Sequence, residues 1–332
     1  MVGASVIAPD GTIVGDGHHE RAGLPHAEIV ALDDAGPRAR GATLICTLEP
    51  CSHQGRTGPC VERIVAAGIH TVVAATEDPN PIVSGRGFQF LESHGVKVVC
   101  GVEAAAAERL NAPFFTAMRL RRPWVILKQA ASLDGAVASA PGQRTAISSE
   151  AARRLADRWR AEVDAIAVGS ETLLVDDPLL TVRQLFRSRP LVRAIFDRSL
   201  RTPASARIFA TLDAGPVLVL TTLESMAGRA ERVRALEAAG GQVVPFDGTV
   251  PGALERLWEK GIQSVLLEGG PRLHRAAWEA DMIDEARLFV APEPLGPAGV
   301  AAASIPVTSL VDVQTRTIGA DVLISGYVHR PR

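Results

Sequence analysis

Residues 47–60, TLEPCSHQGRTGPC, and residues 25–32, PHAEIVAL, are the stretches from which the fold of the first half can be argued. The first places two cysteines on either side of an eight-residue polar loop, and the second places a histidine at the expected start of a helix. One imidazole and two thiolates supply three zinc ligands and leave the fourth position for water, as a catalytic zinc requires. The expected ligands are His26, Cys51 and Cys60.

Glu28 lies two residues after the histidine, near the start of the same expected helix. From there its carboxylate could pass a proton from water on the metal to a departing amine without binding the metal itself. Backbone N–H groups at the helix expected after Pro59 would stabilise a thiolate at Cys60. These residues predict a zinc-dependent deaminase that acts on an amino group of a nitrogen heterocycle, with Glu28 as its catalytic residue.

Two other interpretations of these residues remain open from the sequence. A structural zinc site would need a fourth protein ligand, which His53 could supply, or the cysteines could be buried apolar residues beside an unrelated histidine. Cys46 lies inside an apolar segment and Cys100 ends another, so both are expected to pack as small apolar residues rather than to bind metal. The loop between the ligand cysteines offers polar groups for substrate contact: Ser52, His53, Gln54, Arg56 and Thr57.

Apolar segments alternate with helical patterns along the chain, which predicts layered α/β domains. In the first half, strands are expected at 2–8, 42–48, 70–76 and 96–99, and helices at 25–34, 60–67, 88–94 and 103–118. In the second half, strands are expected at 124–130, 164–169, 191–196, 216–222, 242–245, 263–268 and 285–291, and helices near 149–161, 225–239, 251–260 and 271–280. Segments 310–318 and 321–329 are expected to pair as a hairpin, and the expected domains are 1–118 and 119–332.

Length and composition also limit the classes of function. A chain of 332 residues suggests two domains, and 47% hydrophobic residues suffice for ordinary cores. A net charge of −2 does not indicate a broadly basic surface, so no nucleic-acid partner is expected. Four cysteines are too few for a disulfide scaffold of this length, and the sequence shows neither a secretory signal nor a span of about 18 apolar residues. We therefore expect a cytoplasmic protein with no membrane partner.

Together these motifs resemble one known family, the bifunctional riboflavin-biosynthesis deaminase/reductase. PHAEIVAL, TLEPCSHQGRTGPC and ATEDPNPIVSGRG (residues 75–87) are similar to its deaminase half. KQAASLDGAVA (128–138), DAIAVGSETLLVDDPLLTVR (164–183) and LLEGGPRLHRAAW (266–278) are similar to its reductase half. The resemblance covers nearly the whole chain, and the eight-residue loop between the cysteines distinguishes this family from cytidine and tRNA-adenosine deaminases.

The resemblance implies a fold and a two-step reaction. It implies a cytidine-deaminase-like three-layer α/β domain followed by a dihydrofolate-reductase-like α/β domain. The first would hydrolyse the 2-amino group of 2,5-diamino-6-(5-phosphoribosylamino)pyrimidin-4-one with Zn²⁺, and the second would reduce the ribosyl group to ribityl with NADPH. The partner is then a phosphorylated pyrimidine, and a homo-oligomer is a further expectation.

The resemblance also carries over residues of the reductase half. Cofactor contacts are expected at Ala130, Thr172 and Asp176, and along the run Gly270, Pro271, Arg272, Leu273, His274, Arg275 and Ala276. Substrate contacts are expected at Leu180, Arg183 and Glu268. The glycines after Glu268 would let the backbone approach closely, and the helix that follows could hold phosphate at its N-terminus. No G-x-G-x-x-G follows a strand, so a Rossmann cofactor site is not expected.

The chain departs from the family at three places. It begins at the first strand, without the helix and the Asn-Pro that usually precede this strand in the family. Arg144 stands where the family has a small polar residue, and the tryptophan common near the position of Ala146 is absent. Arg198 replaces a frequent small hydroxyl residue, and our hypothesis is that it contacts the 2′-phosphate of NADPH. One alternative is thus a reductase whose deaminase half is impaired, and another is a first half that serves only as a structural zinc module.

Overall fold

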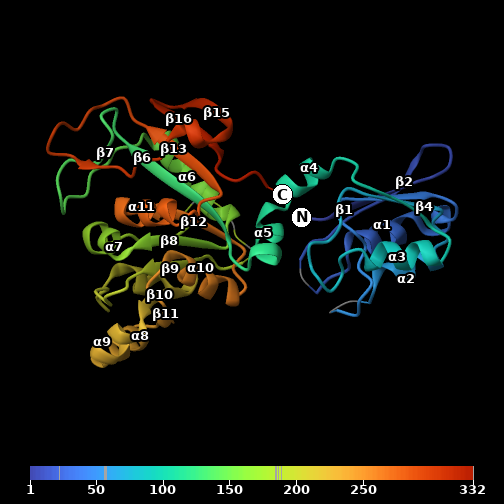
Figure 1. The fold of residues 1–332 in the computed structure, drawn as a ribbon, viewed down its shortest axis with the longest axis horizontal. Helices are drawn as coiled ribbons and strands as arrows, with labels where there is room; N and C mark the ends of the chain where they lie inside the picture. The colour runs from blue at the N-terminus through green and yellow to red at the C-terminus, as the bar shows by residue number, and fades with distance from the viewer. Residues whose placement is uncertain (22, 56–57, 184, 186, 188, 332) are drawn as a thin grey trace. The chain divides into compact units, whose positions relative to one another are not determined.

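The computed structural model describes residues 1–332 except 22, 56–57, 184, 186, 188 and 332. The chain divides into two compact units, residues 1–120 and residues 121–330, each of which is described by itself (Figure 1). The boundary expected between residues 118 and 119 falls inside the helix that ends the first unit, α5 (Ala112–Leu120).

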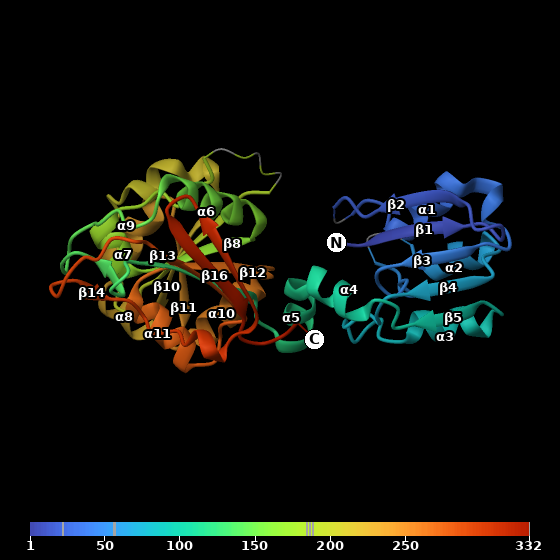
Figure 2. The same cartoon turned by 90° about the horizontal axis from the view of Figure 1, so that it is seen from above.

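The first unit is built on a five-stranded sheet in the order β2-β1-β3-β4-β5, whose strands lie side by side in Figure 2. The strands are β1 (Gly3–Ile7), β2 (Ile13–His18), β3 (Thr43–Cys46), β4 (Thr71–Ala74) and β5 (Lys97–Cys100). Strand β1 is antiparallel to β2 and β3, whereas β3, β4 and β5 are parallel. The parallel strands therefore end at one common edge, which is where the segments bearing the cysteine motif and residues 75–87 begin.

Helices cover the buried face of this sheet. They are α1 (Ala27–Ala35), α2 (Cys60–Ala66) and α3 (Arg86–Ser93), with the 3₁₀ helix η1 (Gly36–Ala39) after α1. Leu32, Ile64 and Leu91 of these helices share one core cluster with Leu44 and other residues of the sheet. Side chains alternate between faces along a strand, and Ile45, on the opposite face, is 39% exposed. The helix expected at 103–118 is two helices, α4 (Ala104–Leu110) and α5, because Asn111 leaves the helical conformation.

Two glycines of β2 let α1 lie directly on the sheet. A Cβ atom at Gly15 would lie 2.3 Å from the carbonyl oxygen of Ala31, and one at Gly17 would lie 2.4 Å from that of Ala27. Carbon atoms do not approach oxygen so closely without repulsion, so no larger residue fits while the helix keeps this position. The glycines thereby fix the distance between the sheet and the first turn of α1.

The second unit is built on a nine-stranded sheet in the order β11-β10-β9-β8-β12-β6-β13-β16-β15. Its strands are β6 (Trp124–Ala131), β8 (Ala165–Gly169), β9 (Val192–Phe196), β10 (Val217–Thr222), β11 (Gln242–Phe246), β12 (Ser264–Gly269), β13 (Glu285–Val290), β15 (Val311–Ile318) and β16 (Asp321–Tyr327). Neighbours are parallel except around β16, which is antiparallel to β13 and β15. The hairpin expected at the C-terminal end is confirmed, with Gly319 at φ +65° in its turn.

Helices and short strands complete this unit. The helices are α6 (Glu150–Glu162), α7 (Ser170–Asp176), α8 (Leu223–Gly228), α9 (Ala230–Ala238), α10 (Val250–Glu259) and α11 (Pro271–Glu279), with 3₁₀ helices η2 (Arg207–Ala214) and η3 (Val307–Ser309). Strands β7 (Ala136–Ala138) and β14 (Val300–Ala301) form a separate pair. The sequence analysis missed α7. In the described residues, no helix has the length and apolar character that crossing a bilayer requires.

Candidate functional sites

The histidine and the two cysteines expected to bind zinc come together in the first unit. His26 is the N-cap residue of α1, Cys51 follows β3, and Cys60 is the first residue of α2. The Nδ1 atom of His26 lies 3.2 Å from the sulfur of Cys60 and 3.4 Å from that of Cys51. All three candidate ligand atoms lie within 4.8 Å of one another.

These distances fit a tetrahedral zinc ion. With Zn–N near 2.0 Å and Zn–S near 2.3 Å, a tetrahedral site separates nitrogen and sulfur by about 3.5 Å. The backbone N–H of Cys60 donates to the sulfur of Cys51 at 3.4 Å. Hydrogen bonds from the Cys60 thiol, from His26 and from this N–H lower the pKa of Cys51 to about 4, despite the opposing effect of burial. The pKa of Cys60 is raised because its thiol donates to Cys51. The site thus favours a thiolate before any metal binds.

Glu28 lies in the first turn of α1 with its side chain buried, 3% exposed. Its Oε2 atom has no hydrogen-bond partner among the described residues. Burial raises the pKa of Glu28 to about 7, and the negative charge of Cys51 adds to this while hydrogen bonding and His26 oppose it. A buried carboxylate oxygen with no protein partner beside three metal-ligand atoms is the arrangement expected of a proton carrier.

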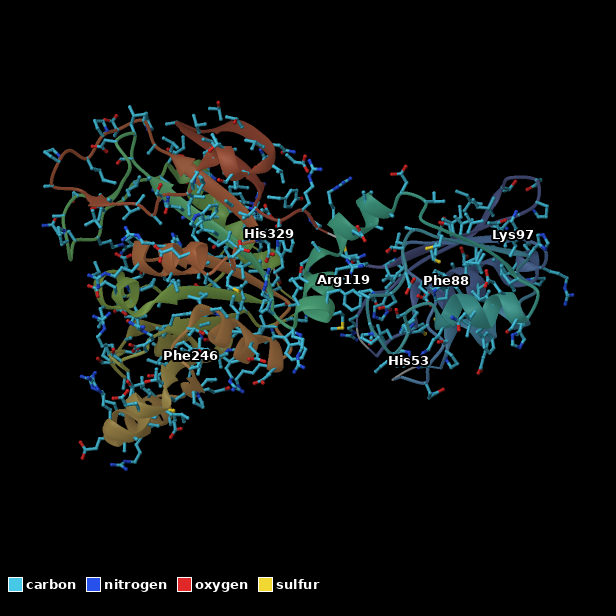
Figure 3. All side chains as sticks on the ribbon, in the orientation of Figure 1. His53, Phe88, Lys97, Arg119, Phe246 and His329 are labelled. Atoms are coloured by element: carbon cyan, nitrogen blue, oxygen red, sulfur yellow. The ribbon has the colours of Figure 1, made fainter. Side chains whose placement is uncertain are left out.

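His53 does not join the ligand group. Among the residues that the structure describes, the metal-binding group consists of His26, Cys51 and Cys60 alone. The Nδ1 atom of His53 (Figure 3) is buried with no hydrogen-bond partner among the described residues, and the charge of His53 lowers the pKa of Asp78. Burial raises the pKa of Asp78 to about 6, and the charges of Glu49 and Cys51 add to this. Asp78 is therefore a polar group within electrostatic reach of both His53 and the candidate ligand Cys51.

The remaining sequence predictions for this unit have mixed outcomes. Cys46 is buried, as expected. The expectation that Cys100 packs inside is wrong, because β5 ends there and the residue is exposed. Arg56 and Thr57, expected as polar groups for substrate, lie outside the described residues.

The second unit has a cavity of about 760 Å³ at the carboxyl ends of its parallel strands. Helices α7, α10 and α11 begin at its wall, at Ser170, Val250 and beside Gly270. Helix N-termini that converge on a cavity favour anionic ligands. Of the expected cofactor residues, five line this cavity: Arg198, Gly270, Arg272, Leu273 and Ala276.

The sequence analysis missed several other residues of the cavity wall. Phe246 ends β11 (Figure 3), and Thr249 caps α10. Arg201 donates to Ser170 at 2.9 Å and to Glu171 at 3.0 Å, so its guanidinium is held at the cavity wall. The signal that could have found Arg201 is its spacing from Arg198, three residues on in the same loop.

The other expected cofactor residues lie around the turn between β12 and α11 or farther away. Thr172 packs against this turn, since its Oγ1 would lie 3.2 Å from a Cβ at Gly270, where φ is +90°. His274 is buried, with Nδ1 3.4 Å from Gln129, and burial lowers its pKa to about 4. Burial raises the pKa of Asp176, and the charge of Arg144 opposes this. Pro271, Arg275 and Ala130 do not line the cavity.

Glu268, an expected substrate contact, belongs to a buried charge network. A register shift between Leu267 and Gly269 in the pairing with β8 makes Glu268 the extra residue of a β-bulge. Its two oxygens accept from Arg160 of α6 at 2.8 and 2.7 Å. Burial alone would raise the pKa of Glu268, but the ion pair with Arg160 lowers it. Burial also lowers the pKa of Lys128, which the charge of Glu268 opposes.

Arg160 and its neighbour Asp157 connect this network to the other expected substrate residues. Arg160 donates to the carbonyl oxygen of Thr181 at 3.3 Å, and Asp157 accepts from the backbone N–H of Arg183 at 3.0 Å. Leu180 is buried with φ +54°, an uncommon value for leucine. The signal that could have found Asp157 is its place on the buried face of α6, beside Ala152, Ala156 and Trp159.

Comparison with known proteins adds to this geometry. Residues 123–324 match the family model described as the RibD C-terminal domain, and residues 1–76 match the cytidine and deoxycytidylate deaminase zinc-binding region. Riboflavin biosynthesis protein RibD of Aquifex aeolicus is 42% identical over 296 residues, which is 89% of this chain and 81% of that protein.

Solved structures agree over the whole chain. Acinetobacter baumannii RibD, form 1, has a TM-score of 0.85 and 35% identity over 98% of this chain and 91% of that one. The Thermotoga maritima structure described as a diaminohydroxyphosphoribosylaminopyrimidine deaminase/5-amino-6-(5-phosphoribosylamino)uracil reductase has a TM-score of 0.83 and 33% identity, covering 100% and 92% of the two chains. The cytidine-deaminase-like and dihydrofolate-reductase-like folds expected from the sequence are thereby confirmed. The chain belongs to the RibD family of riboflavin biosynthesis proteins.

Proposed function

We propose that this chain catalyses two successive steps of riboflavin biosynthesis, a zinc-dependent deamination in residues 1–118 and an NADPH-dependent reduction in residues 119–332. The substrate of the first step is 2,5-diamino-6-(5-phosphoribosylamino)pyrimidin-4-one. The observation that carries the proposal is the convergence of His26, Cys51 and Cys60 beside the buried carboxylate of Glu28. Relatives matched over both halves favour two activities over a reductase with an impaired or merely structural first half.

In the deaminase half, His26, Cys51 and Cys60 would hold zinc, which when bound would activate a water molecule as the nucleophile. Glu28 would carry a proton from the attacking water to the departing amine at its Oε2 atom, which has no partner among the described residues. His53 and Asp78 provide polar groups beside the reacting centre. The leaving group is ammonia, so its release reports this step.

In the reductase half, the large cavity would hold NADPH, which when bound would supply the hydride. Gly270, Arg272, Leu273 and Ala276 of its wall would bind the dinucleotide, and Arg198 would bind the 2′-phosphate. The remaining cofactor positions proposed are Ala130, Thr172, Asp176, Pro271, His274 and Arg275. The substrate contacts proposed are Leu180, Arg183 and Glu268, and the guanidinium of Arg183 would bind the substrate phosphate.

The experiment measures ammonia release and NADPH oxidation separately on one purified protein. In Glu28→Gln, zinc content and NADPH oxidation with the deaminated substrate should stay unchanged while ammonia release is lost. In Glu268→Gln, NADPH oxidation should fall while ammonia release is unchanged. Unchanged ammonia release in Glu28→Gln would remove Glu28 from the mechanism. Cytoplasmic location and homo-oligomeric assembly stay predictions.

A further inference from the structure

Glu49 is a buried carboxylate whose hydrogen bonds, among the described residues, all come from backbone N–H groups. The residue is 2% exposed. Its Oε2 atom accepts from the N–H of Asp78 at 3.1 Å and from that of Gly85 at 2.9 Å, and its Oε1 atom accepts from the N–H of Gly87 at 2.8 Å. Hydrogen bonds to a carboxylate are about twice as strong as those between neutral groups. One side chain thereby binds the backbone at both ends of the ten-residue segment 78–87.

The same segment packs on the peptide that leads to a metal ligand. A Cβ atom at Gly87 would lie 2.1 Å from the carbonyl oxygen of Pro50, the residue between Glu49 and Cys51. The backbone of Glu49 is itself fixed, since its N–H donates to the carbonyl oxygen of Thr76 at 2.9 Å. Segment 78–87 and the peptide that carries Cys51 therefore form one rigid piece with Glu49 at its centre.

We propose that Glu49 is a positioning residue for the deamination, which holds segment 78–87 as a fixed wall of the substrate pocket beside the metal ligands. This inference rests on the proposed deaminase function. Asp78, at the start of the segment, is close enough to Cys51 and His53 to feel their charges. A wall that is free to move would let the pyrimidine ring shift relative to the metal centre and to Glu28. Misplacement by about 1 Å can cost about 100-fold in rate.

Glu49→Gln tests this inference with almost no change in size. Glutamine offers one acceptor oxygen, so its NH₂ group must face either the N–H of Gly87 or those of Asp78 and Gly85. We expect kcat/KM for ammonia release to fall by about 10- to 100-fold and hydrogen exchange of the amides in segment 78–87 to rise. The matched control is Glu77→Gln, because Glu77 lies next to the segment but is exposed, and among the described residues its carboxylate accepts one hydrogen bond, from the Ser84 hydroxyl at 2.8 Å, which glutamine can also accept. That variant should keep wild-type kinetics and exchange.

A second variant moves the wall while residue 49 stays glutamate, although the new Cβ would also lie 2.9 Å from Oε1 of Glu49. In Gly87→Ala the new methyl group must push segment 78–87 away from Pro50, and we expect the same kinetic loss as in Glu49→Gln. Zinc content should remain one per chain in both variants, and NADPH oxidation by the second unit should be unchanged. Wild-type kcat/KM in Glu49→Gln, or loss of zinc that accounts for its lost activity, would overturn the inference. A wild-type protein that releases no ammonia would instead overturn the proposed function, and unaltered exchange in Glu49→Gln would still overturn the positioning role.

Discussion

Gly17 of β2 sets the position of helix α1, which carries Glu28, and Gly17→Ala is the sharpest test of that packing. The new Cβ would lie 2.4 Å from the carbonyl oxygen of Ala27 and 2.5 Å from the backbone nitrogen of Ala31. Ordinary contacts between heavy atoms lie near 3.5 Å, so α1 must retreat by about 1 Å. His26 and Glu28 begin this helix and would move with it. Overpacking of this kind costs about 1–3 kcal/mol, and a shift of about 1 Å can cost about 100-fold in rate.

The control for this change is Gly3→Ala on the neighbouring strand β1. A Cβ there meets nothing nearer than 3.9 Å, so the same substitution should leave activity within about twofold of the wild type. The assay is the initial rate of ammonia release, together with zinc content and urea unfolding of the first unit. Gly17→Ala should be slower by one to two orders of magnitude and less stable than Gly3→Ala. Equal rates in the two variants would refute the argument that the packing of α1 on β2 requires a residue without a Cβ atom at position 17.

Three further predictions concern the second unit. Arg160→Met leaves the carboxylate of Glu268, whose side chain is 7% exposed, without its cation, so the free energy of unfolding of this unit in urea should fall by about 3–5 kcal/mol. Adding Glu268→Gln to this variant should restore part of the loss, whereas an Arg160→Met protein as stable as the wild type would contradict the prediction. Burial lowers the pKa of His274 from 6.5 to about 4, so the unfolded chain binds this proton more tightly than the folded chain. The contribution to the free energy of unfolding should be fully present above pH 6.5 and should fall by up to about 3 kcal/mol as the pH drops toward 4. His274→Gln should reduce this pH dependence when unfolding is measured across the same pH range. Arg198→Ala should weaken NADPH roughly 10- to 100-fold and leave NADH unchanged in binding titrations, whereas a wild type indifferent between the two cofactors would disprove the 2′-phosphate contact.

The convergence of the candidate zinc ligands could be predicted from sequence because their chemistry and spacing are local signals. His26 stands at a helix start, and Cys60 follows Pro59 at another, so both positions follow from capping patterns. The strands and the C-terminal hairpin could be predicted for a similar reason, since their apolar runs are bounded by glycine and proline. The break at Asn111 could not be predicted in the same way, because a single helical pattern spans α4 and α5.

The residues that the sequence did not reveal act over long separations. Glu49 binds backbone groups 29 to 38 positions away, and Arg160 binds Glu268 at a separation of 108. Such pairs carry no local pattern, since an acidic residue before a proline or an arginine in a helix is ordinary by itself. Arg201 was missed because the cavity that it lines forms only when strands and helices from the whole second unit meet. The bulge at Glu268 likewise depends on pairing with β8.

The most direct test of the account is to remove and restore zinc while both activities are followed. Wild-type protein should hold one zinc per chain under reducing conditions, lose ammonia release on dialysis against a chelator, and regain it when zinc alone is returned. NADPH oxidation with the deaminated substrate should continue throughout, because no described residue of the second unit joins the ligand group. Ammonia release that persists in metal-free protein would contradict the claim that His26, Cys51 and Cys60 hold the metal on which deamination depends.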